Sequence, residues 1–291
     1  MERKGMFYSI ASAVIFGFMP LLTKVAYQGG ANAVTAASSR YLMGSLILLT
    51  ILKITKTRLK ITKEEGKALL RLSIFMALTP LLLYSSYQYI DSGLSTTLHF
   101  TYPVFVILLS LILYKNKMRH KQSLATLLCM SGILCLYNPS GQISLFGMAI
   151  ALASGLAYAF YILFLGRSHL DRLPTLTTAF YITLLSGLEL LIFALLTGTF
   201  VYRLTPTAYV AEAALGLLMS VIALTFFQKG VFLCGDVKAS LLSTFEPITS
   251  TFVGMLFLGE RLTPLAYVGM ICILISTIIL VLPDRLRVRE A

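Results

Sequence analysis

An acidic residue that directly precedes a proline inside an apolar run is well suited to handle a solute within a membrane. Glu246 and Pro247 lie near the middle of the apolar segment Ala239–Leu258. A central Asp, Lys or Arg costs roughly 2.5–3.5 kcal/mol on insertion scales, so each charge inside a span is informative. The proline leaves one backbone carbonyl in need of another partner. The pair predicts a carboxylate that binds a substrate ammonium or accepts a proton; the alternative is a structural ion pair or a silent, protonated glutamate.

Positively charged and titratable side chains occur in other apolar runs. Arg40 lies in the outer third of one run, His99 lies at a similar depth in another, and Lys24 lies close to an outer end. Together they predict a surface that attracts the carboxylate or phosphate of a solute. Each of these residues could instead have a purely structural role. We prefer that role for Lys24, which can extend to the outer headgroups, and for His99, which can make a polar contact between helices. For Arg40 the structural and the substrate-binding roles are equally favoured. Of two further charges within spans, Lys229 is expected to snorkel and Glu189 to pair with a neighbour.

Aromatic rings and prolines supply the remaining candidates. The chain has 15 Tyr and 18 Phe but no Trp. A phenol within a span offers a hydrogen bond and a face that binds cations, although many tyrosines anchor the membrane interface instead. The tyrosines expected at a substrate site are Tyr84, Tyr102, Tyr158 and Tyr161. The prolines expected to act as hinges between inward and outward states are Pro20, Pro80, Pro103 and Pro247.

The elements that position these residues must be membrane helices. Of 291 residues, 57% are hydrophobic and only 12% are charged, with a mean hydropathy of +0.85, whereas a soluble chain has about 25% charged residues. A span needs about 20 apolar residues, and only helices or closed barrels cross lipid. The runs are too long for barrel strands, so we predict an all-α membrane protein with ten transmembrane helices. They are Met6–Tyr27, Ala33–Leu52, Leu69–Ile90, Leu94–Tyr114, Ser123–Tyr137, Ser144–Leu165, Thr175–Leu196, Thr207–Leu233, Ala239–Leu258 and Pro264–Leu282.

Basic residues orient these helices. With the N-terminus in the cytoplasm and an uncleaved first span, all but four of the 24 Lys and Arg residues fall on the cytoplasmic side. The four exceptions are Lys24, Arg40, Arg203 and Arg261. Ten alternating spans therefore satisfy the positive-inside rule, with both the N- and the C-terminus cytoplasmic. The net charge of +12 is then explained by topology and by contacts with anionic membrane lipids rather than by nucleic acid.

Helix-start signals and the cysteines give two further expectations. Thr62 and Glu65 have the spacing of a capping box, and Pro174, Pro206 and Pro264 occupy positions where a first-turn proline fits. The four cysteines lie in apolar stretches without a CxxC spacing. They are expected to be small core residues rather than a redox or metal site, and we expect no cofactor.

The sequence contains an internal repeat. Gly5–Val25 aligns with Gly147–Arg167 at a shift of 142, and both segments carry small residues at four-residue spacing. Tyr102-Pro103 aligns with Glu246-Pro247 at a shift of 144. Five spans per repeat is an odd number, so the repeats, residues 1–139 and 140–291, must enter the membrane in opposite directions. Inverted repeats of this kind are typical of secondary transporters, whose site lies between the halves.

Several short motifs of the second half form a pattern that a known protein family shares. They are Ala239-Ser240-Leu241-Leu242, Glu246-Pro247, Leu258-Gly259-Glu260-Arg261-Leu262-Thr263 and, in the last helix, Gly269. In these residues the chain resembles the EamA family of the drug/metabolite transporter superfamily, many members of which also carry an arginine at the position of Arg40. The first half departs from the pattern, because Lys115-Asn116-Lys117 stands where Gly-Glu is common. The resemblance implies paired five-helix domains and export or exchange of amino acids and related metabolites.

Together these features predict a secondary transporter, exporter or exchanger, of small metabolites such as amino acids. Alternating access would use a central cavity between the two repeats of a multi-pass protein in the plasma or inner membrane. An exporter of cationic or drug-like compounds remains the alternative. An intramembrane lipid-modifying enzyme is disfavoured, because G-x-S-x-G, H-E-x-x-H and Gly-rich phosphate loops do not occur. The expected partners are a small-molecule substrate and membrane lipids, not nucleic acid, with a monomer or weak homodimer as the assembly.

Overall fold

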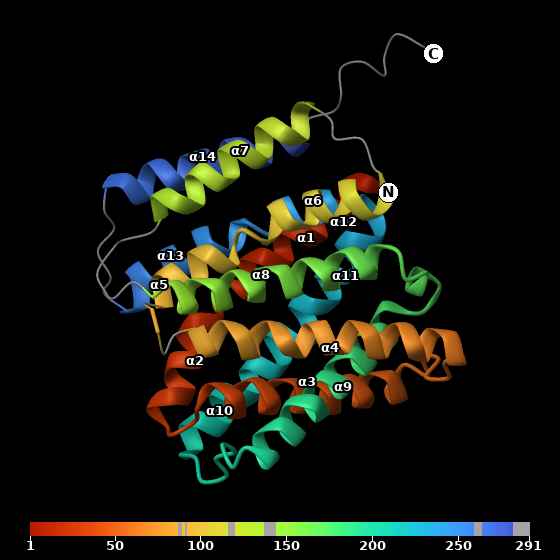
Figure 1. The fold of residues 1–291 in the computed structure, drawn as a ribbon. Coiled ribbons are helices and arrows are strands. Elements are labelled where there is room, and N and C mark those ends of the chain that lie inside the picture. Colours follow the sequence, from red (N-terminus) through yellow and green to blue (C-terminus); the bar gives the residue numbers. More distant parts are fainter. Residues whose placement is uncertain (87–88, 91, 116–119, 137–143, 259–263, 282–291) are drawn as a thin grey trace.

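In a computed structural model of the chain, residues 1–291 are described except for 87–88, 91, 116–119, 137–143, 259–263 and 282–291. The described residues form helices and no strand (Figure 1). The elements are α1 (Glu2–Phe16), α2 (Met19–Gln28), α3 (Ala33–Ile54), α4 (Lys63–Ser86), α5 (Ser92–His99), α6 (Tyr102–Tyr114), α7 (His120–Leu136), α8 (Leu145–Gly166), η1 (Leu170–Arg172), α9 (Thr175–Leu196), α10 (Pro206–Leu215), η2 (Gly216–Ala223), α11 (Leu224–Cys234), α12 (Asp236–Leu242), α13 (Phe245–Leu258) and α14 (Pro264–Val281).

Within the described residues these segments group into ten rods, because four rods are made of consecutive pieces. The interrupted rods are α1–α2, α5–α6, α10–η2–α11 and α12–α13. Seven rods are long and apolar enough to cross a membrane: Glu2–Gln28, Ala33–Ile54, Lys63–Leu83, Ser95–Tyr114, Leu145–Gly166, Thr175–Leu196 and Pro206–Cys234. The predicted all-helical membrane protein is thus confirmed. Three of the ten expected spans, those built on α7, α12–α13 and α14, do not reach this length and hydropathy in the described residues.

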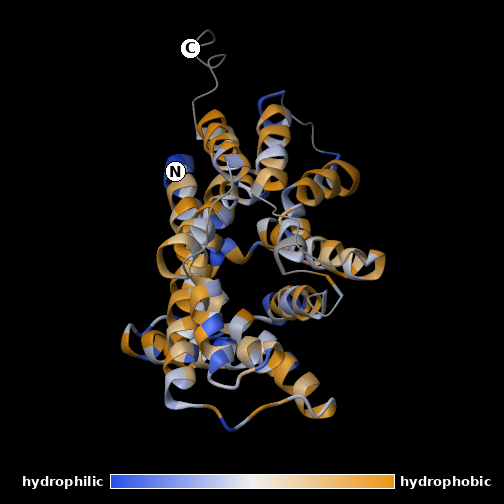
Figure 2. Ribbon diagram, turned by 90° about the vertical axis from the view of Figure 1, so that its left-hand side faces the viewer, coloured by the Kyte–Doolittle hydropathy of each residue, from blue (hydrophilic) through white to orange (hydrophobic). Residues whose placement is uncertain are grey.

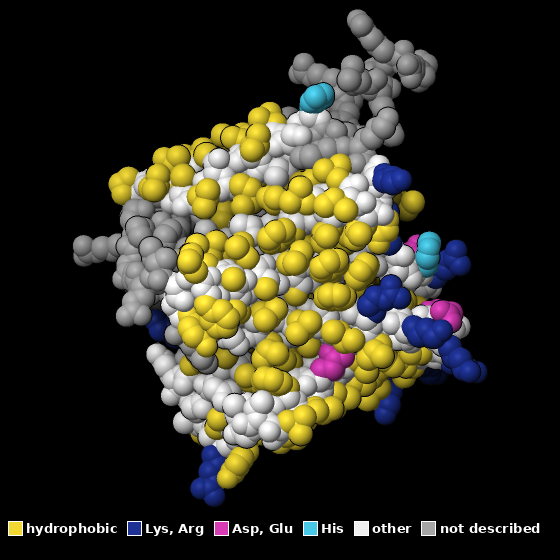
Figure 3. Space-filling model, in the orientation of Figure 1, with side chains coloured by type: hydrophobic (Ala, Val, Ile, Leu, Met, Phe, Trp, Pro, Cys, Tyr) yellow, Lys and Arg dark blue, Asp and Glu magenta, His cyan; other side chains and the backbone are white. Residues whose placement is uncertain are grey.

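The outer surface of the bundle is apolar. Large side chains such as Phe7, Ile112 and Leu196 are 66%, 71% and 83% exposed, and hydrophobic residues run along most of each helix (Figure 2). Figure 3 shows the same on one face, where Lys and Arg gather mainly at the end that holds the N-terminus. We call this end the basic end. This clustering agrees with a chain that crosses the membrane in alternating directions. That the basic end lies on the cytoplasmic side stays a prediction.

The capping box predicted at the start of α4 is present, whereas Pro174 is the N-cap residue before α9 and does not lie in its first turn. The backbone N–H of Thr62 donates to the Glu65 carboxylate over 2.6 Å, and the Glu65 N–H donates to the Thr62 hydroxyl over 3.2 Å. This reciprocal pair is a capping box at the start of α4. Asn32 caps α3 by accepting from the Thr35 N–H at 2.8 Å, and Pro206 is the first residue of α10.

The two small-residue stripes pack against other helices. Their members are Gly5, Ser9 and Ala13 on α1 with Gly17 directly after it, and Gly147, Ala151, Gly155 and Ala159 on α8. A Cβ added at Gly17 would lie 2.4 Å from the Thr249 Cβ of α13, and one at Gly155 would lie 2.8 Å from the His99 carbonyl oxygen. Only glycine permits these approaches, which bring α1 onto α13 and α8 onto the end of α5.

Candidate functional site

Three helix breaks lie next to predicted hinge prolines. The break between α1 and α2 falls at Gly17 and Phe18, that between α5 and α6 at Phe100 and Thr101, and that between α12 and α13 at Ser243 and Thr244. In each case a proline, namely Pro20, Pro103 or Pro247, lies in the first turn after the break. A helix tolerates proline in its first turn, because the backbone N–H that proline lacks would have no acceptor within that helix. Pro80 differs, since it lies inside the continuous helix α4.

A small cavity lies where these breaks converge. We call it the central cavity; its volume is about 70 Å³. Its lining residues are Phe16, Met19, Arg40, Tyr41, Met76, Thr79, Pro80, Leu83, His99, Tyr158 and Glu246. The first nine belong to the first half of the chain, and Tyr158 and Glu246 belong to the second. Residues from both halves of the chain therefore line one cavity, and a substrate site there stays a prediction.

Glu246 and Arg40 give the central cavity its charge. Glu246 lies in the first turn of α13, where the positive end of the helix dipole favours a carboxylate. Arg40, on α3, is only 7% exposed and interacts electrostatically with Glu246. Its guanidinium lies 4.6 Å from the centre of the Tyr41 ring, and its Nη1 lies 2.8 Å from the Met19 Sδ. A carboxylate and a guanidinium therefore face one apolar, aromatic-walled space.

His99 is held in place at the edge of this space. It is the last residue of α5, it is 9% exposed, and its Nδ1 lies 3.0 Å from the Ser154 hydroxyl of α8. Its ring centre lies 5.8 Å from that of Tyr158. One nitrogen of the imidazole thus makes a polar contact with a neighbouring helix, while the residue also lines the cavity. The sequence had left these two roles as alternatives, and the structure shows both.

The predicted tyrosines separate into two layers. Tyr158 lines the central cavity, whereas Tyr102 and Tyr161 are 1% and 0% exposed and do not line it. The centre of the Tyr102 ring lies 4.8 Å from that of Tyr158, and the Tyr161 ring stacks on the Tyr158 ring with their centres 5.8 Å apart. Tyr102 and Tyr161 therefore pack against Tyr158 and help to fix its position. The side chain of Tyr84 lies outside the described residues.

The other charges within spans lie away from the central cavity. Lys24 is exposed on α2, and the Lys229 ammonium lies 5.3 Å from the Tyr8 ring centre. Glu189 accepts a hydrogen bond of 2.7 Å from the Ser73 hydroxyl, which is the neighbour that the sequence could not name. These three residues have local structural partners or solvent access and do not contribute to the cavity wall.

Sequence reasoning missed one carboxyl group near this site. Glu212, on α10, is completely buried and interacts electrostatically with Arg40. The available signal was the presence of a charged residue inside the predicted span Thr207–Leu233. Directly after α10 the chain forms the π-helical segment η2 (Gly216–Ala223), and such segments occur frequently at functional sites. No pattern of the sequence indicated this segment.

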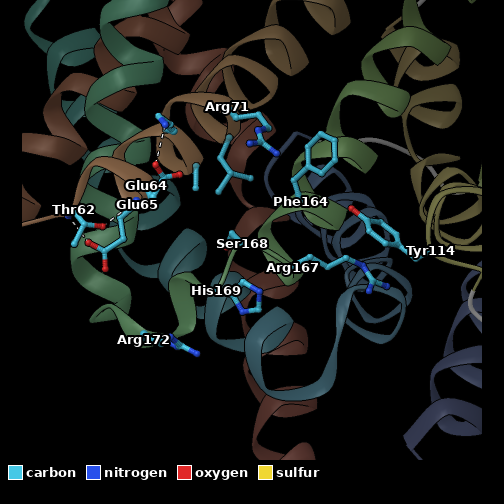
Figure 4. Close-up of a pocket in the computed structure, with 13 residues that line it drawn as sticks. Thr62, Glu64, Glu65, Arg71, Tyr114, Phe164, Arg167, Ser168, His169 and Arg172 are labelled. Carbon is cyan, nitrogen blue, oxygen red and sulfur yellow. Dashed lines mark hydrogen bonds and ion pairs between the residues drawn. The ribbon is translucent and has the colours of Figure 1, made fainter.

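A second, larger hollow opens at the basic end. It has a volume of about 560 Å³ and lies between the start of α4, the end of α6 and the α8–α9 connection (Figure 4). We call it the basic cleft; its lining residues are Thr62, Glu64, Glu65, Lys67, Ala68, Arg71, Leu72, Tyr114, Phe164, Arg167, Ser168, His169 and Arg172. The Arg167 guanidinium lies 3.7 Å from the Tyr114 ring centre and 3.5 Å from the Asp236 carboxylate. Lys67 pairs with Glu64 at 2.8 Å.

Arg71 and Arg172 give the basic cleft an excess of positive charge. The Arg71 guanidinium lies 5.6 Å from the centre of the Phe164 ring. Within the described part of the chain neither arginine forms an ion pair with an acidic side chain. The cleft is therefore an opening in which basic side chains outnumber acidic ones.

Known proteins share the sequence pattern of this chain over most of its length. The sequence model of the EamA-like transporter family matches the chain twice, over residues 3–138 and 145–282. The threonine/homoserine exporter RhtA of Escherichia coli K12 is 30% identical over 265 residues, which cover 88% of this chain and 83% of RhtA. The uncharacterized inner membrane transporter YicL of Salmonella typhimurium is 27% identical over 303 residues, 99% of each chain.

A solved crystal structure shares the fold. It aligns with a TM-score of 0.83 over 96% of this chain and 98% of the other, at 14% sequence identity. At that identity the likeness concerns the fold alone. The two family matches and the relative at 30% identity confirm the resemblance seen in the motifs. The chain is a multi-pass membrane transporter rather than an enzyme, and it belongs to the EamA-like transporter family.

Proposed function

We propose that the protein is a secondary transporter that exchanges or exports small metabolites such as amino acids through the central cavity. The observation that carries this proposal is the shared wall of that cavity, in which Arg40 and His99 of the first half face Tyr158 and Glu246 of the second. Sites at the interface of two repeats, formed by interrupted helices, are typical of secondary transporters. Five rods per half would place the halves in opposite orientations.

The size of the cavity supports alternating access. At about 70 Å³ it is well below the roughly 300–1,000 Å³ of common ligand sites. A substrate therefore needs a more open arrangement than the one seen here. The helix breaks beside Pro20, Pro103 and Pro247 offer the places at which rods can bend without breaking further backbone hydrogen bonds.

The charges of the central cavity favour a zwitterion. A substrate ammonium fits the Glu246 carboxylate at the start of α13, while a substrate carboxylate fits the Arg40 guanidinium. The free α-amino acid has both groups on one carbon. The name of RhtA, a threonine/homoserine exporter, is consistent with this choice and makes L-threonine a suitable first probe.

A cationic substrate is the second candidate. Tyr41, Tyr158 and Phe16 line the cavity beside Glu246, and aromatic faces attract organic cations. In that case Arg40 would contribute no contact to the substrate. The two candidates differ in whether the substrate needs a carboxylate of its own.

Counterflow in proteoliposomes tests the proposal. We expect vesicles preloaded with an unlabelled substrate to take up the same labelled compound, with a panel of amino acids, nucleosides and cationic drugs as competitors. Glu246→Gln should reduce this exchange roughly tenfold to hundredfold, because the substrate ammonium loses its counter-charge. The matched control is Glu189→Gln, which alters a carboxyl on α9 that is bound to Ser73 away from the cavity. Absence of saturable flux for the whole panel, or full activity of Glu246→Gln, would refute the proposal.

A further inference from the structure

Packed side chains of three second-half helices lie between the central cavity and the basic end. Tyr161 follows Tyr158 on α8 toward the basic end, and the ring centre of Phe227, on α11, lies 6.0 Å from that of Tyr158. Leu241 of α12 lies between the start of that helix and Glu246. Tyr161, Phe227 and Leu241 are at most 1% exposed and belong to one hydrophobic core. The central cavity is therefore closed toward the basic end by these helices.

Two ion pairs hold the start of α12 at the basic end, where Figure 1 shows it near the N-terminus. The carboxylate of Asp236, the first residue of α12, lies 3.5 Å from the guanidinium of Arg167, directly after α8. Lys238 pairs with Glu2, the first residue of α1. The side chains of Asp236 and Arg167 are 13% and 33% exposed, so water reaches the first pair only in part. We call these two ion pairs the α12 clasp.

The two ends of α12 allow this helix to move as a unit. Gly235 alone joins α11 to α12, with a φ of +87° that favours glycine. At its other end α12 stops at the break of Ser243 and Thr244, ahead of Pro247. Residues at the ends of elements can absorb the backbone rotation of a moving segment. A tilt of α12 at these junctions therefore leaves the hydrogen bonds inside the neighbouring helices in place.

The α12 clasp adds to the packing of the buried side chains without locking them. A partly exposed ion pair changes an equilibrium constant by up to about fivefold. The Arg167 guanidinium also lies 3.7 Å from the centre of the Tyr114 ring of α6, which adds a cation–π contact at the same place. Loss of the charges should therefore shift the balance between a closed and an open arrangement by several-fold.

We propose that α12 is the gate of the central cavity at the basic end, and that the α12 clasp holds this gate closed. When the gate opens, both ion pairs break, the start of α12 moves away from α1 and α8, and Leu241 leaves the path to the cavity. The inference rests on the proposed transport function, in which a substrate enters at one end of the molecule and leaves at the other. It names the segment and the contacts that close one of these ends.

Thiol labelling without substrate measures how readily the gate opens. Thr79→Cys, in protein whose four native cysteines are replaced, places one thiol in the cavity wall. A membrane-impermeant thiol reagent is added to vesicles at the face from which Glu64→Cys reacts, because the Glu64 side chain is 82% exposed at the basic end. We expect Asp236→Asn with Lys238→Gln to raise the labelling rate of Thr79→Cys several-fold. The matched control Lys67→Gln breaks the exposed Lys67–Glu64 pair within α4 and should not change this rate.

Charge reversal separates the ion pair from a general loss of packing. Asp236→Arg places two like charges side by side and should raise the labelling rate of Thr79→Cys further. Arg167→Asp combined with Asp236→Arg restores a pair of opposite charges at the same place. The labelling rate of this double reversal should therefore return toward that of the protein with an intact clasp.

A disulfide can hold the gate shut. A Cβ added at Gly166, the last residue of α8, would lie 3.3 Å from the Cβ of Asp236, close to the roughly 3.5–4.5 Å found in disulfides. Oxidation of Gly166→Cys with Asp236→Cys should therefore link α8 to α12 and stop counterflow, and a thiol reductant should restore it. Asp236→Cys alone, oxidised in the same way, is the control and should keep its exchange activity.

Three results would overturn the inference. They are a labelling rate of Thr79→Cys that Asp236→Asn with Lys238→Gln leaves unchanged, a double reversal that labels as fast as Asp236→Arg alone, and normal exchange by the cross-linked protein. If no compound of the panel exchanges in the unaltered protein, the transport proposal fails by itself. The labelling rates then decide on the gate, because they need no substrate.

Discussion

At the scale of single residues, the site rests on a carboxylate and a guanidinium whose positions come from different halves of the chain. Glu246 lies at the start of α13, and Arg40 lies in the second turn of α3. The sequence pointed to both, because a charge inside an apolar span is costly and easily noticed. It overlooked Glu212, whose importance depends on its burial beside Arg40. Burial of this kind follows from helix packing and not from the span itself.

The tyrosines show the same limit. Tyr102, Tyr158 and Tyr161 all lie within apolar runs, yet only Tyr158 reaches the central cavity. Tyr158 and Tyr161 are three residues apart on α8, nearly one helical turn, and still differ in what they face. The rotation of a helix that is apolar on all sides cannot be read from its hydropathy, because lipid and protein neighbours are equally apolar.

Replacing Arg40 with glutamine should distinguish the two substrate classes. Loss of a hydrogen bond to a charged group costs about 1.5–3 kcal/mol, which is roughly a tenfold to hundredfold loss of affinity. We expect Arg40→Gln to weaken L-threonine exchange by that factor and to leave exchange of L-threonine amide within a few-fold of normal. Competition counterflow with both compounds measures this difference. Arg203→Gln, which changes an exposed arginine, is the control; equal losses for both compounds would show that Arg40 does not bind the carboxylate.

At the scale of elements, the interrupted helices set the position of the site. The sequence located most helices and their caps, for example the Thr62–Glu65 capping box. It also placed a proline at corresponding positions of both halves, where α6 and α13 now begin. The break itself was not predictable, since Pro80 leaves α4 continuous although it too lies within a span. Tertiary contacts decide which prolines accompany a break.

Restoring the backbone donor at Pro247 should slow the transport cycle. In the broken helix the Ser243 carbonyl accepts from the Glu246 N–H over 3.0 Å, and Pro247 has no N–H that could replace this contact with the regular bond from four residues later, so the chain leaves the helix at Ser243 and Thr244. We expect Pro247→Ala to favour a continuous helix there, so that the exchange rate falls several-fold while the affinity for substrate stays within a few-fold. Initial rates of counterflow over a range of substrate concentrations separate the two effects.

The matched control is Pro264→Ala, which alters the exposed first residue of α14, away from the central cavity. An exchange rate of Pro247→Ala equal to that of this control would argue against a hinge at the α12–α13 break.

At the scale of the whole molecule, charge and apolar surface are segregated along the bundle. Apolar side chains cover much of the face seen in Figure 3, while basic side chains gather mainly at the end where the N-terminus lies (Figure 1). The basic cleft opens at that end, and the central cavity lies at the helix breaks. If the basic end meets the cytoplasm, as the positive-inside rule predicts, we expect exported solutes to meet the basic cleft first.

The basic cleft should then attract anionic substrates. Fields of clustered charges raise the local concentration of oppositely charged solutes and are screened by salt. We expect the double substitution Arg71→Gln with Arg172→Gln to slow entry of an acidic amino acid from the basic end several-fold at low salt and little at high salt. The initial flux of the acidic amino acid, recorded at two ionic strengths, measures this difference. Lys24→Gln is the control, because Lys24 is exposed on α2 outside the cleft; a salt-independent effect would mean that the arginines act structurally.

Chemical labelling from within the cavity shows whether substrate occupies the space between the two halves. Thr79 lines the cavity from α4, and Ile74 of the same helix is 45% exposed on the outer surface. With the four native cysteines replaced, Thr79→Cys should be modified by a small thiol reagent in a way that blocks exchange. A transported substrate should protect it, whereas Ile74→Cys should show neither block nor protection. Free labelling of Thr79→Cys at saturating substrate, with exchange intact, would show that substrate does not occupy this cavity.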